Sequence, residues 1–173
     1  FGEIGVKAMF TKQDKEVYEA MRHLSIMKGY PSTTKEEIKQ AEEGLNNKLN
    51  NVTILSESAL LTRLHWWTVE YGLVGTVDNY TIYGAGLLSS LSESKSCLDD
   101  EKVKKIPLTV EAVDTPYDIT NPQPQLFVTK SCRHLTQVLE DFADQMCFRK
   151  GGAESVEVAI DSEIISTCEY SSG

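Results

Sequence analysis

Apolar residues at helical spacing predict two amphipathic helices in the first third of the chain. The first begins at Thr11, a residue type that caps helices, and ends at Gly29. The second follows Pro31, with Thr33 and Glu36 at the spacing of a capping box. Its other face is polar, so we expect this helix to lie on the surface. The apolar stripes are Val17, Met21, Leu24 and Met27 in the first helix, and Ile38, Ala41, Leu45 and Leu49 in the second.

A third helix, from about Ser56 to Val74, has a different pattern. Apolar residues surround most of its circumference, which predicts a helix of the core. A turn-forming pair, Asp78 and Asn79, comes after it, and Gly84-Ala85-Gly86 then leads into the start of a further helix. The apolar residues of the third helix are Ala59, Leu60, Leu61, Leu64, Trp66, Trp67, Val69, Tyr71 and Leu73.

The last part of the chain mixes strands and helices. Residues 106–113 and 125–129 are predicted to be short strands, separated by a proline-rich connection that resists regular structure. Ser131 is expected to cap a helix, and residues 147–160 resemble a hairpin, followed by a polar tail. The fold class indicated is mainly α with a small β component.

Charge excludes some classes of partner. The 173 residues carry 17 basic and 26 acidic side chains, a net charge of −9. Nucleic acids and anionic membranes both attract a basic face, so we expect neither as a partner. No apolar run approaches the roughly 20 residues of a membrane span. The four cysteines have no metal-site spacing, which favours free thiols and a cytoplasmic location.

Glu70 is the most informative candidate for chemistry. On a helix it shares its face with Trp66 and Trp67, so its carboxylate lies among residues expected in the core. A buried carboxylate without a partner costs several kcal/mol, so something must pair with it, bind it or keep it protonated. Two interpretations are open: an ion pair with Arg63 on the same stripe, which residue types alone favour, or a metal ligand.

The remaining candidates are less specific. Gly84-Ala85-Gly86 before Ser89 and Ser90 could hold an anion on free amides, but a tight turn entering a helix explains the same pattern. Trp66 and Trp67 are typical of core packing. No two of the three histidines have the helical spacing that places both rings on one metal.

Two segments together carry a resemblance to a known family. Residues 64–73, LHWWTVEYGL, and residues 82–90, IYGAGLLSS, resemble the pterin-dependent aromatic amino acid hydroxylases, especially bacterial members that act on phenylalanine. The likeness continues more loosely to about residue 160. It implies that residues 1–160 form the C-terminal part of the helical catalytic domain. Within this part, 12–54 is a helical segment, 55–96 the motif helix and loop, 97–160 a small α+β part, and 161–173 a polar tail.

The resemblance also implies a set of site residues. Members of the family hold Fe(II) with two histidines and one carboxylate, and Glu70 matches the carboxylate. Trp66 matches the residue beside the aromatic ring of the substrate, and Gly86 and Ser89 match positions at the amino acid substrate. Ser89 would also orient an iron-bound histidine.

Two further positions, Thr62 and His65, match the wall of the pterin pocket, although His65 stands where the family usually has tyrosine. Tyr83 and Ser90 are supporting positions. The two histidine ligands of the family precede the segment that matches Phe1. The chain begins at Phe1, without methionine, so we expect it to be part of a longer protein.

The implied parent enzyme hydroxylates L-phenylalanine to L-tyrosine with O2, using Fe(II) and a tetrahydropterin. We expect the 173-residue chain alone to bind neither cofactor and to be inactive, because one ligand of three cannot hold iron. The alternative is a binding or interaction module that kept the hydroxylase scaffold without catalysis. Loss of the preceding helices would expose the face of the Trp66 helix, so we also expect a homo-oligomer that buries residues of this helix or of the loop 84–90 between copies.

Overall fold

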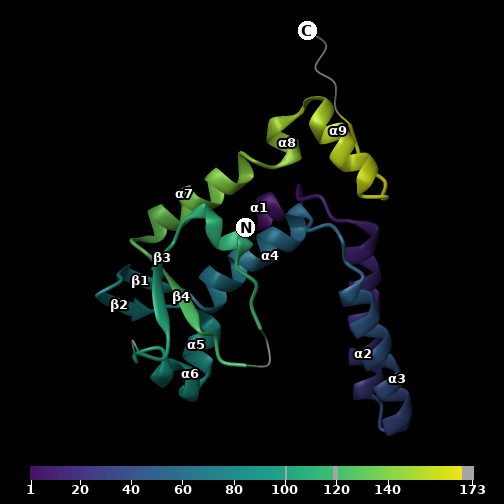
Figure 1. The fold of residues 1–173 in the computed structure, drawn as a ribbon, viewed down its shortest axis with the longest axis horizontal. Helices are drawn as coiled ribbons and strands as arrows, with labels where there is room; N and C mark the ends of the chain where they lie inside the picture. Colours follow the sequence, from purple (N-terminus) through teal and green to yellow (C-terminus); the bar gives the residue numbers. More distant parts are fainter. Residues whose placement is uncertain (100, 119–120, 169–173) are drawn as a thin grey trace. The chain divides into compact units, whose positions relative to one another are not determined.

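A computed structural model describes residues 1–99, 101–118 and 121–168, and it is mainly helical with one small sheet (Figure 1). The expected fold class is therefore confirmed. The chain forms two compact units. The sheet unit contains residues 1–8 and 60–150, and the helix-pair unit contains residues 9–59 and the chain from Gly151 onward. No helix among the described residues is long and apolar enough to cross a membrane.

The sheet unit is built on four short strands in the order β2-β1-β4-β3. β1 and β2 form an antiparallel hairpin, in which Thr76 pairs with Asn79, and β4 runs parallel to both β1 and β3. The strand expected at 125–129 is confirmed as β4. The strand bounds are β1 Leu73–Thr76, β2 Asn79–Ile82, β3 Lys104–Pro107 and β4 Gln125–Thr129.

Short helices surround this sheet. Ser131 caps α7 by accepting a hydrogen bond from the backbone N–H of His134, as the sequence predicts. The first residues of α4 belong to the helix-pair unit, and the rest of that helix belongs to the sheet unit. The bounds are α1 Gly2–Gly5, α4 Glu57–His65, the π-helical turn η1 Trp66–Glu70, α5 Ala85–Ser89, α6 Leu91–Ser96, the 3-10 helix η2 Val110–Asp114, α7 Cys132–Ala143 and α8 Cys147–Lys150.

Trp67 lies at the centre of the core of the sheet unit. Its side chain is fully buried, its ring packs at 5.4 Å from Phe127 of β4, and its indole N–H donates to the Thr115 carbonyl at 2.8 Å. Leu64 and Leu73 are equally inaccessible to solvent. This face of the third predicted helix is thus covered by the sheet unit itself, contrary to the expected exposed patch.

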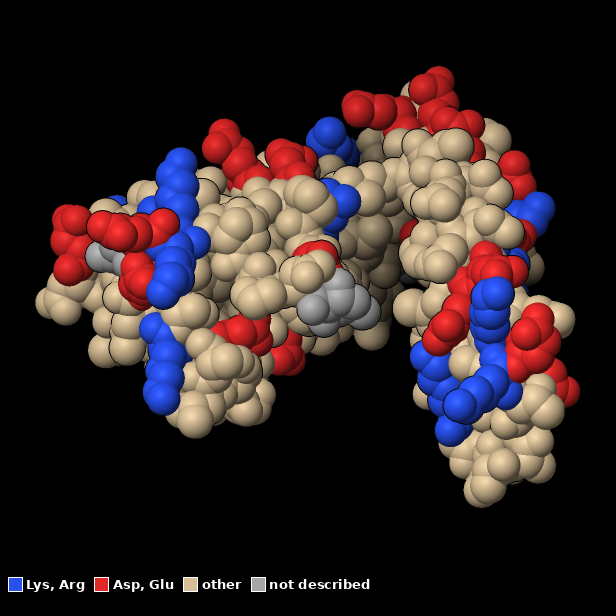
Figure 2. All heavy atoms as spheres, turned by 60° about the horizontal axis from the view of Figure 1, so that its bottom comes forward, with Lys and Arg blue, Asp and Glu red and all other residues tan. Residues whose placement is uncertain are grey.

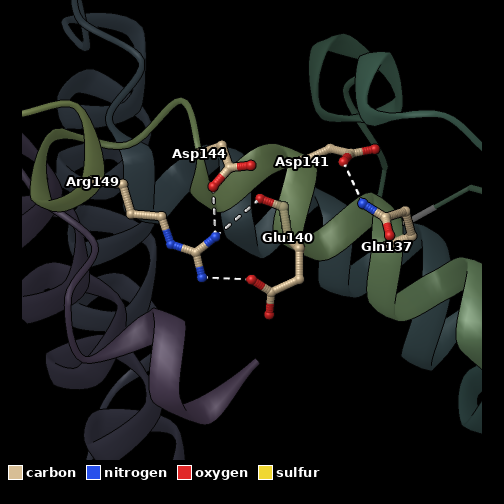
Figure 3. Close-up of polar contacts among 5 residues, drawn as sticks. All are labelled: Gln137, Glu140, Asp141, Asp144 and Arg149. Carbon is tan, nitrogen blue, oxygen red and sulfur yellow. Dashed lines mark hydrogen bonds and ion pairs between the residues drawn. The ribbon is translucent and has the colours of Figure 1, made fainter.

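Salt bridges connect the end of α7 to α8. Arg149 donates to Glu140 at 2.5 Å and to Asp144 at 2.7 Å, while Gln137 and Asp141 form a separate contact one turn earlier (Figure 3). These two carboxylates raise the pKa of Arg149 above its ordinary value. The group is exposed and links α8 to α7, so its role is structural.

The helix-pair unit contains α2 (Lys12–Gly29), α3 (Lys35–Asn50) and α9 (Gly152–Asp161). Thr11 and Thr34 each form a complete capping box at the start of α2 and α3. Ion pairs such as Lys28–Glu42, at 2.7 Å, join the two helices. Acidic and basic side chains lie interspersed along this pair in Figure 2 rather than segregating by sign.

Three sequence predictions are wrong in position or type. The third helix stops at Glu70 instead of reaching Val74, because Leu73 pairs with both Ile82 and Val128 in the sheet. The expected strand at 106–113 stops at Pro107, near the end of its partner β4, and then forms η2. The capping box of α3 uses Thr34 and Glu37, one residue later than predicted.

The hairpin expected at 147–160 is also wrong. This segment forms α8 and α9, and at their junction Gly151 and Gly152, the first residue of α9, adopt φ values of +62° and +76°. Glycine adopts this left-handed region without steric cost, so the pair ends one helix and starts the next. Ser155 donates to the Gly151 carbonyl at 2.9 Å and adds a local contact in the first turn of α9.

Candidate functional site

The candidate site begins at a change of helix type. α4 continues into η1, where the Tyr71 N–H donates to the Trp66 carbonyl at 2.9 Å, five residues back. Inside the bend, the Thr68 hydroxyl donates to the Leu64 carbonyl at 2.6 Å. Such π-turns are rare, and many occur at functional sites. The widened turn places Glu70 at the last helical position, and Tyr71 and Gly72 separate it from the first strand.

Glu70 is half-buried, and no hydrogen bond or ion pair involves its carboxylate among the described residues. Arg63 instead donates to the carbonyls of Val113 and Asp114, at 3.2 and 3.5 Å. The prediction of an ion pair between Glu70 and Arg63 is therefore wrong. A hard, uncommitted oxygen donor suits a metal, so the metal-ligand interpretation stays open.

The Gly84–Gly86 segment packs directly against the turn that carries Glu70. A Cβ on Gly84 would lie 2.4 Å from the Glu70 carbonyl oxygen, and one on Gly86 would lie 3.3 Å from the Glu70 carboxylate. The amides of Tyr83 and Gly84 both donate to the Gly72 carbonyl. The glycines are thus needed for close backbone approach, as the tight-turn interpretation holds.

The expected substrate positions, Gly86 and Ser89, lie on α5, and Ser89 is exposed. Its hydroxyl donates to the Gly86 carbonyl at 2.9 Å. Ser90 follows as the N-cap of α6 and accepts from the Glu93 N–H. Glu70, Gly86 and Ser89 therefore form one connected series of contacts.

Trp66 is held between two tyrosines. Its ring stacks on Tyr71, with centroids 4.6 Å apart and planes 19° apart, and on Tyr117, at 4.4 Å and 12°. Its indole Nε1 is buried and has no hydrogen-bond partner within the described chain. Stacking on both faces leaves only the ring edge for another group, so the interpretation of Trp66 as ordinary core packing is incomplete.

Sequence reasoning missed Tyr71, Tyr117 and Glu93. The Tyr71 hydroxyl donates to Glu93 at 2.9 Å. Burial, this hydrogen bond and nearby carboxylates raise the pKa of Tyr71 to about 12. The spacing of Tyr71 from Trp66 could have suggested a contact if a π-turn had been anticipated. Tyr117 lies within the proline-rich connection, directly after Pro116, and gave no local signal; it also lines a pocket of about 410 Å³.

The two expected pterin positions lie earlier on α4. His65 meets the ring of Phe1 edge-on, with centroids 5.3 Å apart, and Thr62 is exposed. The supporting residue Tyr83 packs its ring over Gly72, and burial raises its pKa to about 12. No contact of Thr62 or His65 tests their assignment to a pterin.

The donor set does not make a complete iron centre. Within the described ranges, no three side chains of His, Cys, Asp or Glu gather closely enough to hold a metal. A two-histidine, one-carboxylate site needs two imidazoles that these residues do not place beside Glu70. The residues present fit the carboxylate of such a site but not the whole site.

Comparison with known proteins connects this arrangement to a family. The family described as biopterin-dependent aromatic amino acid hydroxylase matches residues 33–154. Phenylalanine-4-hydroxylase of Pseudomonas aeruginosa is 40% identical over 85 residues, 49% of this chain and 32% of that protein. The enzyme of Caulobacter vibrioides is 43% identical over 90 residues, 51% of this chain and 31% of that protein. The matched segment thus spans about a third of these curated relatives.

Two solved structures are similar to part of this chain. Phenylalanine hydroxylase of Chromobacterium violaceum with iron and phenylalanine bound shares 31% identity, with a TM-score of 0.45 over 63% of this chain and 41% of that one. The cobalt-bound form of that enzyme shares 29% identity, with a TM-score of 0.45 over 71% and 40%.

Proposed function

This chain belongs to the biopterin-dependent aromatic amino acid hydroxylase family, and we propose that it forms the C-terminal part of the catalytic domain of a phenylalanine hydroxylase. The relatives named phenylalanine-4-hydroxylase support L-phenylalanine as the substrate. In this proposal O2 is the co-substrate and L-tyrosine the product. The observation that carries the proposal is the uncommitted Glu70 carboxylate, which lies against Gly86 in a turn stabilised by the sheet.

Each site residue has a separate task in this proposal. Glu70 supplies the carboxylate ligand of Fe(II), and Trp66 offers its ring edge to the aromatic ring of the substrate. Gly86 and Ser89 border the amino acid part of the substrate. When bound, Fe(II) and a tetrahydropterin supply the chemistry that activates oxygen.

The pterin assignment concerns the preceding helix. Thr62 and His65 line the pterin pocket from α4, where Thr62 is exposed and His65 is half-buried against Phe1. Both side chains can form hydrogen bonds with the polar edge of a heterocycle. Their place on a regular helix fixes their spacing before any cofactor binds.

We propose that the 173-residue chain alone is inactive, because Glu70 has no imidazole partners among the described residues. Anaerobic calorimetry of this chain with Fe(II) is expected to show no stoichiometric tight binding. Tight one-to-one binding would mean that another histidine, such as His65, completes a site and would overturn this part of the proposal.

The role of Glu70 is tested in the natural polypeptide that carries this chain. Glu70→Gln keeps the side-chain volume but removes the charge, so iron content and phenylalanine turnover should fall at least tenfold while the fold persists. Glu111→Gln removes an exposed charge from η2 and is the matched control. Wild-type iron content and turnover in the Glu70 variant would refute the assignment.

A second candidate function is a binding or interaction module that kept the hydroxylase scaffold. It is favoured by the incomplete donor set within the described chain. The two functions differ in one measurement on the natural polypeptide: an enzyme contains stoichiometric iron and oxidises phenylalanine, whereas a module does neither.

Self-association is part of the proposal, and of the two expected regions we propose the loop 84–90 with the residues that follow it. The Trp67 face is buried, but Leu88 and Leu91, on either side of Ser89, are 64% and 72% exposed. We propose that these leucines meet a second copy of the chain in the cytoplasm. Light scattering should detect a dimer or larger species, and Leu88→Ser should weaken it; a monodisperse monomer would refute this proposal.

A further inference from the structure

We infer that Tyr71 is a positioning residue, and that its hydrogen bond to Glu93 ties the turn carrying Trp66 and Glu70 to helix α6. The inference rests on the proposed function only in its consequence for the site. We call this Tyr71–Glu93 hydrogen bond the tether. It lies within the sheet unit and is testable without metal, pterin or substrate.

Tyr71 contacts both halves of the candidate site. Its ring stacks on Trp66, which belongs to the same turn. Its Cε2 atom also lies 2.9 Å from the position of a Cβ on Gly86, which belongs to the following helix α5. A displacement of this one ring would therefore change the surroundings of Trp66 and of Gly86 together.

The indole of Trp66 depends on this ring. Its Nε1 has no hydrogen-bond partner among the described residues, so no polar contact of the side chain fixes its orientation. The indole ring is instead held by stacking on the rings of Tyr71 and Tyr117. Tyr117 lies in an irregular segment, whereas Tyr71 directly follows the π-turn and has an anchored hydroxyl.

Glu93 provides that anchor. Its carboxylate accepts the Tyr71 hydroxyl at 2.9 Å, and its own backbone N–H is capped by the Ser90 side chain in the first turn of α6. The acceptor is thus held by a helix start rather than by a flexible loop. A hydrogen bond to a charged acceptor is stronger than one between neutral groups.

The tether also distinguishes two carboxylates. Both Glu70 and Glu93 act electrostatically on the Tyr71 phenol, but only Glu93 accepts a hydrogen bond from its hydroxyl. Glu93 is thereby committed to Tyr71, whereas Glu70 has no hydrogen-bond partner within the described chain. The arrangement leaves Glu70 as the carboxylate available to a ligand.

Hydrogen exchange of the Trp66 indole N–H, followed by NMR on the metal-free 173-residue chain, tests the tether. Tyr71→Phe keeps the ring and removes the hydroxyl. We expect it to speed Trp66 indole exchange roughly two- to tenfold, the effect of one lost hydrogen bond on local opening. The Trp67 indole, bonded to the Thr115 carbonyl, should exchange as in the unmodified chain.

Variants of the acceptor separate the tether from general packing. Glu93→Ala should reproduce the effect of Tyr71→Phe, and Glu93→Gln should restore much of the protection because its amide oxygen still accepts. The double variant Tyr71→Phe with Glu93→Ala should be no faster than either single variant, since both remove the same contact. Additive effects would overturn the inference.

Tyr80→Phe is the matched control, because it removes a half-buried tyrosine hydroxyl that donates to the Cys97 carbonyl and does not stack on Trp66. It should leave Trp66 exchange unchanged. Equal acceleration of both indoles by Tyr71→Phe and Tyr80→Phe would reveal general destabilisation and refute the tether. Failure of iron binding by Glu70 would refute the proposed function and leave this result intact.

Discussion

The two units of this chain are stabilised by different means. The sheet unit has a continuous core in which Leu64, Trp67 and Leu73 are fully buried. In the helix-pair unit, α3 and α9 bury no residue completely, and α2 buries only Val17 and Leu24 among its residues. The second unit thus has little buried apolar surface, and its exposed ion pairs each contribute little to stability. A precise site can therefore be supported by the first unit more readily than by the second.

Truncating a core leucine of the sheet unit should cause the largest loss of stability among the changes considered. Leu64→Ala leaves a cavity in the sheet unit, and we expect the free energy of unfolding to fall by about 3–5 kcal/mol. Leu49→Ala, at a position on α3 that is 46% exposed, is the matched control and should change it by about 0.5 kcal/mol or less. Urea unfolding followed by far-ultraviolet circular dichroism measures both. Equal losses would show that the contrast between the units is wrong.

Replacing a glycine with alanine should change the free energy of unfolding in opposite directions in the two units. Gly84→Ala forces a Cβ to 2.4 Å from the Glu70 carbonyl oxygen, and we expect a loss of about 3 kcal/mol. Gly44→Ala lies within α3 with no atom within 4 Å of its Cβ, and should gain about 0.5–1 kcal/mol. Thermal unfolding of both variants gives the two signs. Tolerance of Gly84→Ala would contradict the close packing of the turn.

Alkaline pH should weaken the sheet unit through Tyr83. Its pKa is about 12 in the folded chain, against about 10 when unfolded, so folding favours the protonated phenol. This contribution, about 2 kcal/mol, is fully present below pH 10 and is lost as pH rises toward 12. Tyrosinate absorbance should show two groups, Tyr71 and Tyr83, that titrate near pH 12, and Tyr83→Phe should remove one of them. A titration unchanged by this substitution would refute the shift.

The smallest effect concerns a helix cap. Thr34→Ala removes the side-chain acceptor of the capping box and should destabilise the start of α3 by about 1 kcal/mol. Thr33→Ala alters the neighbouring residue, which the sequence pattern favours but the structure does not use. Amide exchange in the first turn of α3 distinguishes them. A larger effect of Thr33→Ala would restore the sequence prediction.

Much of the fold could be predicted because its signals are local. The caps at Thr11 and Ser131 and the strand at 125–129 follow from residues within a few positions of one another. Glu70 was singled out by its place beside Trp66 and Trp67 on a predicted helix, and the family resemblance, carried by residues 64–73 and 82–90, suggested its role as a metal ligand. The absence of an ion pair at Glu70 could not be predicted from the sequence. Arg63 could have paired with Glu70, but in the structure it donates to backbone carbonyls some fifty residues away.

By itself, the sequence determined where α2 and α7 begin, and the family resemblance predicted that Trp66, Glu70 and Gly86 belong to one site. Only the tertiary structure decided that the third helix ends at Glu70, because strand pairing of Leu73 with Ile82 and Val128 competes with helical hydrogen bonds. It also decided the stacking of Tyr117 on Trp66, a contact between residues far apart in the chain. Local hydrogen bonds are encoded by neighbouring residues, whereas such long-range contacts depend on how the whole core packs.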